Sequence, residues 1–82
     1  MLNIERKENF LRRISKVKDN STLNQIKKKI KKIIENPEIG KPIRYVRKGT
    51  REVYIGSFRL SYVYLKEENK LVFLDFYHKD KQ

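Results

Sequence analysis

The apolar residues change their spacing near Pro37, and this change restricts the chain to folds that combine helices with a sheet. Before Pro37, Leu23, Ile26 and Ile30 recur every three or four residues, which is the period of one helix face. After Pro37, the segment 58–66 is rich in the β-branched and aromatic residues that favour strands. The sequence therefore predicts helices in its first half and strands in its second.

Two helices are predicted before Pro37. The first has one apolar stripe, made of Phe10, Leu11, Ile14 and Val17, and is expected over residues 5–17. Residues 19–22 interrupt this pattern and offer side-chain oxygens that cap a second helix. Pro37 ends that helix, because the residue before a proline avoids the helical conformation. The two stripes favour an antiparallel hairpin; the alternative, a basic helix lying free on a membrane, leaves the sheet without a cover.

Four strands with short connections are predicted after Pro37. They span residues 43–47, 51–55, 58–66 and 71–78, with turns at 40–42, 48–49, 56–57 and 67–69. Residues 2–4 are a candidate fifth strand. Short connections are typical of antiparallel neighbours. The expected fold class is therefore α+β: a single two-layer domain, residues 1–82, with an N-terminal helical hairpin packed on one face of a four- or five-stranded, mainly antiparallel sheet.

The composition narrows the function. The chain has 82 residues, 21 of them Lys or Arg and 10 of them Asp or Glu, which gives a net charge of +11. It has no cysteine and one histidine, so a disulfide scaffold, a thiolate metal site and a histidine-based zinc site are excluded. No apolar run approaches the roughly 18 residues of a membrane span. A small basic domain of this kind is expected to bind a polyanion.

Arg59 is the first candidate functional residue. Alternation along the predicted strand places it on the face opposite Phe58 and Leu60, which are better suited to the core. Arg59 then lies on the open face of a central strand, a rigid position that suits a residue holding a phosphate. The alternative is an ion pair between Arg59 and either Asp75 or Glu52 on a neighbouring strand.

Other polar residues have both a structural and a functional interpretation. A turn in the second half is surrounded by Arg44, Arg47, Lys48 and Arg51. These four form either a solvated rim or a surface that follows a phosphate backbone. The histidine, His78, is either a proton-transfer group or a structural side chain at a strand end. The tyrosines are either packing residues or platforms for bases.

Several short segments of the sequence resemble sequences of the RelE/ParE toxin superfamily, which supplies the toxin half of prokaryotic toxin–antitoxin pairs. Asn36-Pro37 and Gly40-Lys41-Pro42-Ile43 are similar to the link that leads from helix to sheet in that family. The run from Arg51 to Tyr62 resembles its central strands, and its Gly56–Tyr62 part is the most specific. The segment from Val72 to Lys79 is similar to its closing strand.

The resemblance implies a ribosome-dependent mRNA endoribonuclease, in which a ribose 2′-hydroxyl attacks the adjacent phosphate. Arg59 matches the central arginine of the family, which is expected to stabilise the charge on that phosphate. Lys79 matches a terminal basic residue, and His78 and Lys81 are neighbouring candidates for proton transfer or phosphate contact. The residues expected to bind RNA or the ribosome are Arg44, Arg47, Lys48, Arg51, Lys28 and Lys32.

The resemblance also implies the partners. A cognate, acidic, RelB-like antitoxin is expected to neutralise the basic toxin in a hetero-oligomer, and the ribosome and mRNA are the expected targets. The expected location is the cytoplasm. No metal, no cofactor and no membrane partner are expected.

Two departures from the family pattern keep other functions open. Glu52 and Tyr54 occupy positions that are often basic in the family, and no tyrosine follows the terminal basic residues, because Tyr77 lies earlier, inside the strand. A ParE-like toxin that acts on DNA gyrase without nuclease activity is therefore one alternative. A basic RNA-binding domain without catalysis is the other.

Overall fold

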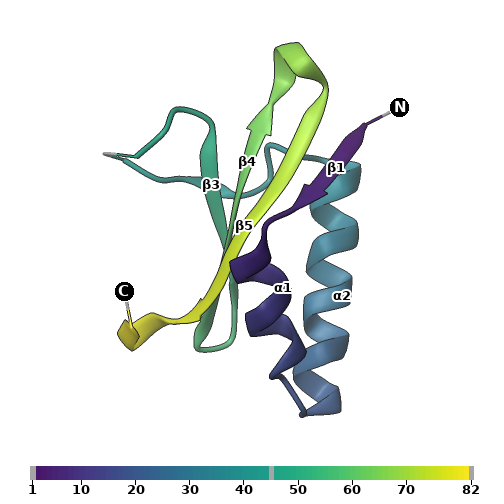
Figure 1. The fold of residues 1–82 in the computed structure, drawn as a ribbon, viewed down its shortest axis with the longest axis vertical. Helices are drawn as coiled ribbons and strands as arrows, with labels where there is room; N and C mark the ends of the chain where they lie inside the picture. The colour runs from purple at the N-terminus through teal and green to yellow at the C-terminus, as the bar shows by residue number, and fades with distance from the viewer. Residues whose placement is uncertain (1, 45, 82) are drawn as a thin grey trace.

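The computed structural model describes residues 2–44 and 46–81, with only the backbone described for Lys81. Its helices are α1 (Glu8–Ser15) and α2 (Asn20–Glu35). Its strands are β1 (Asn3–Arg6), β2 (Lys41–Pro42), β3 (Thr50–Ile55), β4 (Phe58–Leu65) and β5 (Lys70–His78). Short 3-10 turns follow β4 and β5: η1 (Lys66–Glu68) and η2 (Lys79–Lys81). The two helices run antiparallel and cover one face of the sheet, which confirms the predicted α+β architecture (Figure 1).

The sheet has five strands in the order β1-β5-β4-β3-β2, so β4 is the central strand. The predicted fifth strand is present, and it pairs parallel to β5, with Asn3 opposite Lys70 and Arg6 opposite Phe73. The other pairings are antiparallel. The strand takes up residues that were predicted to begin the first helix. That helix starts at Glu8 instead, because the backbone N–H of Lys7 donates to the Phe73 carbonyl at 2.9 Å and continues the sheet pairing.

The prediction for residues 40–47 is wrong. The expected turn at 40–42 contains β2, and the expected strand at 43–47 is a loop, of which Tyr45 lies outside the described residues. Lys41 and Pro42 pair with Glu52 and Arg51 at the edge of the sheet. An edge position suits proline, which has no N–H to donate to a further strand.

The second helix begins as predicted. The Asp19 carboxylate accepts hydrogen bonds from the backbone N–H groups of Ser21 and Thr22, both at 3.3 Å, and from the Thr22 hydroxyl at 2.7 Å. These bonds, that of the Thr22 hydroxyl above all, lower the pKa of Asp19 from its ordinary value. The helix ends at Glu35, directly before Asn36-Pro37.

The core lies between the helices and the sheet. Its largest fully buried side chains on the helix side are Tyr62, Phe73, Ile33, Leu60 and Leu71. The other face of the sheet was predicted from the sequence to be open. In the structure, part of this face is covered. Val63 and Val72 are paired there and are buried, and Gly49 of the loop before β3 lies against Val63. The open part of this face is therefore the end that carries Arg59.

One junction joins the end of α2 to the sheet. The Tyr62 hydroxyl donates to the Pro37 carbonyl at 2.8 Å and accepts from the Gly40 N–H at 2.9 Å. Gly40 has no room for a side chain, because a Cβ there would lie 2.6 Å from the Tyr62 oxygen. The Arg51 guanidinium completes the junction by donating to the carbonyls of Gly40 and Glu38 at 2.7 and 3.0 Å.

We expect Tyr62→Phe to lower the free energy of unfolding by about 1–3 kcal/mol, because it leaves the buried Gly40 N–H without its acceptor. Urea denaturation measures this. The matched control is Tyr64→Phe, which removes a hydroxyl from the same face and strand, and which we expect to change stability by less than about 0.5 kcal/mol. Equal losses in the two variants would contradict the role of the junction.

Candidate functional site

Arg59 lies on the open end of the sheet with its guanidinium held in place. Nη1 donates to the Phe58 carbonyl at 3.0 Å and to the Gly56 carbonyl at 3.4 Å. The guanidinium carbon lies 3.9 Å from the centre of the Tyr54 ring, in a cation–π contact. Tyr54 itself is 48% exposed. Within the described part of the chain, Nε and Nη2 make no hydrogen bond, so their N–H groups are available to a phosphate in the fork geometry of arginine.

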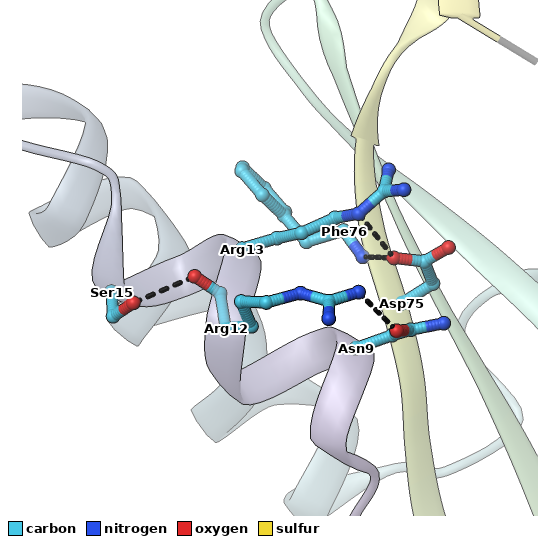
Figure 2. Close-up of polar contacts among 6 residues, drawn as sticks. All are labelled: Asn9, Arg12, Arg13, Ser15, Asp75 and Phe76. Carbon is cyan, nitrogen blue, oxygen red and sulfur yellow. Dashed lines mark hydrogen bonds and ion pairs between the residues drawn. The ribbon is translucent and has the colours of Figure 1, made fainter.

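The predicted alternative, an ion pair between Arg59 and a neighbouring carboxylate, is wrong. Figure 2 shows that Asp75 is engaged at the edge of β5: its carboxylate lies 3.4 Å from Nε of Arg13 on α1 and accepts from the Phe76 N–H at 2.8 Å. Glu52 accepts a hydrogen bond from Tyr77. Arg59 is therefore held by carbonyls and an aromatic ring, and its charge is not neutralised by either acid.

Tyr77 lies on the same face and, like Glu52 and Tyr54, was not selected as a site residue by the sequence analysis. It pairs directly with Arg59 across β4 and β5, and its hydroxyl donates to Glu52 Oε2 at 3.0 Å. Burial first, and then the hydrogen bond and charge of Glu52, raise the pKa of Tyr77 to about 12 from 10.0. The phenol therefore stays protonated near neutral pH. Arg59, Tyr54, Tyr77 and Glu52 form one surface, which we call the Arg59 face.

The structure does not bring His78 to the Arg59 face. His78 pairs with Phe58, and its ring meets the Phe58 ring edge-on at 5.4 Å, on the side of the sheet that the helices cover. Its Nδ1 accepts from the Asp80 N–H at 3.2 Å and lies 3.6 Å from the Asp80 carboxylate. His78 therefore lies on the opposite face of the sheet from Arg59, because it pairs with Phe58, and neighbouring strand residues point to opposite faces.

The terminal lysines follow β5. The Lys79 N–H donates to the Ser57 carbonyl at 2.8 Å, which fixes η2 beside the turn that leads to Arg59, and the Lys79 side chain is exposed. The side chain of Lys81 lies outside the described atoms. The structure thus brings the Lys79 backbone near the candidate site.

The six basic residues that were predicted to bind RNA or the ribosome divide into separate groups. Lys32 on α2 lines two surface cavities that are also lined by Tyr54, with volumes of about 270 and 290 Å³, and Lys28 lines the second of them. These lysines therefore border the Arg59 face. Arg51 instead holds backbone carbonyls at the junction.

The other three residues that were predicted to bind RNA or the ribosome lie at the other end of β3. Arg44, Arg47 and Lys48 are exposed in the loop before this strand. Four strand residues, or about 13 Å, separate this loop from Tyr54. The loop is thus a second basic surface, apart from the one that α2 provides.

Two further observations describe the surroundings of the site. In residues 2–44 and 46–81, no three side chains of the metal-binding types lie close enough together to hold an ion. None of the helices in the same residues is long and apolar enough to cross a membrane.

Comparison with solved structures identifies the same fold in bacterial toxins. The intact E. coli RelBE toxin–antitoxin complex contains a chain that matches with a TM-score of 0.80 at 21% identity, over 95% of this chain and 96% of that one. The isolated E. coli RelE toxin matches with a TM-score of 0.79 at 18% identity, over 95% and 84% of the two chains. The Mycobacterium tuberculosis RelBE2 complex gives a TM-score of 0.73 at 22% identity, over 94% and 96%. Identities this low show a shared fold.

A comparison with curated proteins gives no significant match. The family model described as the ParE toxin of the type II toxin–antitoxin system parDE matches residues 4–82. This match spans nearly the whole chain and includes the Arg59 face. The chain therefore belongs to the ParE toxin family of type II toxin–antitoxin systems, within the RelE/ParE superfamily.

Proposed function

We propose that this toxin cleaves messenger RNA on the ribosome, with Arg59 bound to the scissile phosphate. The observation that carries the proposal is the state of the Arg59 guanidinium: it is fixed on the central strand, it is not paired with Glu52 or Asp75, and its Nε and Nη2 groups have no partner in the described residues. A preorganised donor of this kind stabilises charge that develops in a transition state.

The proposed reaction needs no cofactor. The ribose 2′-oxygen forms a bond to the adjacent phosphorus while the bond from phosphorus to the 5′-oxygen breaks. The products are a 2′,3′-cyclic phosphate and a free 5′-hydroxyl. One proton leaves the 2′-hydroxyl and one is gained by the 5′-oxygen, so the protein supplies positioning, a proton acceptor and a proton donor.

The proton-transfer groups in this proposal are Glu52 and Tyr77. Glu52 uses Oε2 to accept from Tyr77, so its other carboxylate oxygen can take the proton of the 2′-hydroxyl. Tyr77 has a pKa of about 12 and is protonated at neutral pH, which suits a donor to the leaving oxygen. Glu52 can then return a proton to Tyr77 through their hydrogen bond. Lys79 is proposed as a second phosphate contact. Lys81 is proposed to contact the phosphate as well.

The basic surfaces on either side of Tyr54 give the proposed path of the RNA. Lys32 borders both cavities that Tyr54 lines and Lys28 borders one of them, and each phosphate contact there adds affinity that is sensitive to salt. Arg44, Arg47 and Lys48 are proposed to contact ribosomal RNA from the loop before β3. A ribosome would supply the substrate positioning that an 82-residue domain has little surface to provide.

The proposed regulator is an acidic antitoxin that binds this +11 toxin in the cytoplasm as a hetero-oligomer. The support is the family itself, which is defined by toxin–antitoxin systems, and the likeness of the fold to chains taken from toxin–antitoxin complexes. Opposite charge would speed the encounter of the two proteins.

A second candidate function is inhibition of DNA gyrase without cleavage of RNA. Glu52 favours it, because a carboxylate on the Arg59 face opposes the binding of a phosphate and already holds the hydroxyl of Tyr77. In this case Arg59 and Tyr54 would contact a protein surface.

We expect Arg59→Ala to lower the rate of mRNA cleavage about 10²–10³-fold, since removing one such donor has an effect of this size in other enzymes. Primer extension on messages translated in a purified ribosomal system measures the rate. Arg12→Ala is the matched control: it removes the same charge from α1, where the Arg12 guanidinium donates to the Asn9 side chain and the Ser15 hydroxyl bonds to the Arg12 backbone carbonyl, which alanine keeps, and cleavage should be unchanged.

Primer extension with and without ribosomes, together with a gyrase supercoiling assay, separates the two functions. Cleavage that requires ribosomes supports the nuclease. Absence of cleavage with and without ribosomes, together with inhibition of gyrase supercoiling, would replace it with the second candidate.

We expect Tyr77→Phe to remove one late step from the pH titration of tyrosine, followed by near-ultraviolet absorbance, because this phenol ionises near pH 12 and not near 10.0. Since the folded-state pKa is raised, the protonated phenol stabilises the fold fully below about pH 10, and this contribution is lost as the pH rises toward 12. Glu52→Gln should lower the pKa of Tyr77. An unchanged titration in both variants would show that the hydroxyl pair does not form.

A further inference from the structure

A further cavity lies on the side of the sheet that the helices cover. It has a volume of about 400 Å³ and opens at the end of the helical hairpin, where α1 turns into α2. The residues that line it include Arg13, Lys16, Lys18, Phe58, Phe76 and His78, and Tyr77 also borders it. We call it the hairpin-end cavity. We propose that it binds an acidic peptide segment of a partner protein, which inserts one bulky apolar side chain while its carboxylates contact the lysines.

The floor of the hairpin-end cavity is aromatic. The rings of Phe58 and Phe76 stack with their centres 4.9 Å apart and an angle of 13° between their planes. The His78 ring stands edge-on to Phe58, at 86°. One face of each phenylalanine is thus covered by the other. Phe76 is buried, but Phe58 and His78 are only partly buried, so apolar surface remains at the mouth of the cavity. An apolar side chain can cover this surface and gain free energy from its removal from water.

The rim of the cavity is cationic. Lys16 and Lys18 are exposed on the connection between the helices, and in the described residues no carboxylate lies within ion-pair distance of either. The nearest acid in sequence, Asp19, is occupied by the first turn of α2. Arg13 contacts Asp75 at the edge of β5. The two unpaired lysines therefore give the mouth of the cavity a positive charge that acidic side chains complement.

The position of the cavity favours a peptide over RNA. The sheet separates it from Arg59, so an RNA strand laid across the Arg59 face does not reach its floor. The stacked pair leaves less ring surface for bases, which bind to aromatic faces. The family to which the chain belongs works in pairs of proteins, so a protein partner is available to it. The inference does not depend on whether the toxin cleaves RNA.

The consequence is that a partner protein can bind the toxin on the side of the sheet away from Arg59. A peptide in the hairpin-end cavity contacts Phe58 and His78, whereas the side chain of Arg59, the sequence neighbour of Phe58, points to the opposite face of the sheet and does not line the cavity. Binding at the cavity therefore leaves the guanidinium of Arg59 accessible, and it can occur together with binding at the Arg59 face.

The test uses a synthetic polyglutamate peptide with one central tryptophan. The toxin has no tryptophan, so the fluorescence of the peptide reports binding directly. We expect saturable binding that weakens about tenfold or more in the double variant Lys16→Glu/Lys18→Glu. The matched control is Lys27→Glu/Lys31→Glu, which makes the same change of charge on the exposed side of α2 and should bind nearly as well as the unaltered toxin.

Two further measurements test whether the apolar side chain of the peptide contributes to binding and whether the peptide binds at the hairpin-end cavity. Replacing the tryptophan of the peptide by serine, with an added fluorophore as reporter, should weaken binding about tenfold or more, and Arg59→Ala should leave binding unchanged. Equal weakening in the two double variants would reduce the interaction to general charge attraction and overturn the proposal. Displacement of the peptide by polyuridylate from the unaltered toxin and from Arg59→Ala alike would assign the cavity to RNA instead. Absence of binding would also overturn the proposal.

Discussion

The rest of the structure depends on the buried hydroxyl of Tyr62. This one oxygen bonds to both sides of the connection that follows α2, at Pro37 and at Gly40. Through it, the end of a helix is fixed to the central strand. The position of α2 along β3 follows, and so does the approach of Lys28 and Lys32 to Tyr54. A contact inside the core thus sets where positive charge meets the sheet surface.

The sequence was sufficient for the parts of the fold that depend on local patterns. The period of the apolar residues located α2, and the Asp19 side chain marked its start. Alternation along β4 placed Arg59 on the other face of the sheet from Leu60. The edge of the sheet was not predictable in this way, because Lys41 and Pro42 form a strand only through pairing with β3. The covered end of the open face, where Gly49 lies against Val63, is likewise a contact between distant segments.

The composition of the site depended on a register shift that no local pattern marks. Counted back from the pair Leu65 and Lys70, a regular hairpin would place Phe76 opposite Arg59. The irregularity beside Ser61 moves the pairing by one residue, so that Tyr77 lies opposite Arg59 and His78 opposite Phe58. A shift of one residue exchanges the two faces of a strand. For this reason His78 lies on the face that the helices cover, and Tyr77 lies on the Arg59 face. The same two strands therefore carry a polar surface on one side and an aromatic cavity on the other.

The parallel pairing of β1 with β5 has a consequence for the order of events during synthesis. Residues 3–6 cannot pair until residues 70–73 have been made, and Phe10 of α1 stacks on Phe73 at 5.2 Å. Contacts between segments so far apart in the chain form late and slowly. The strand that completes the core also brings Tyr77 to Arg59. The Arg59 face therefore forms only after the residues up to Tyr77 have been synthesised, so a chain that ends before β5 has Arg59 without the tyrosine that pairs with it.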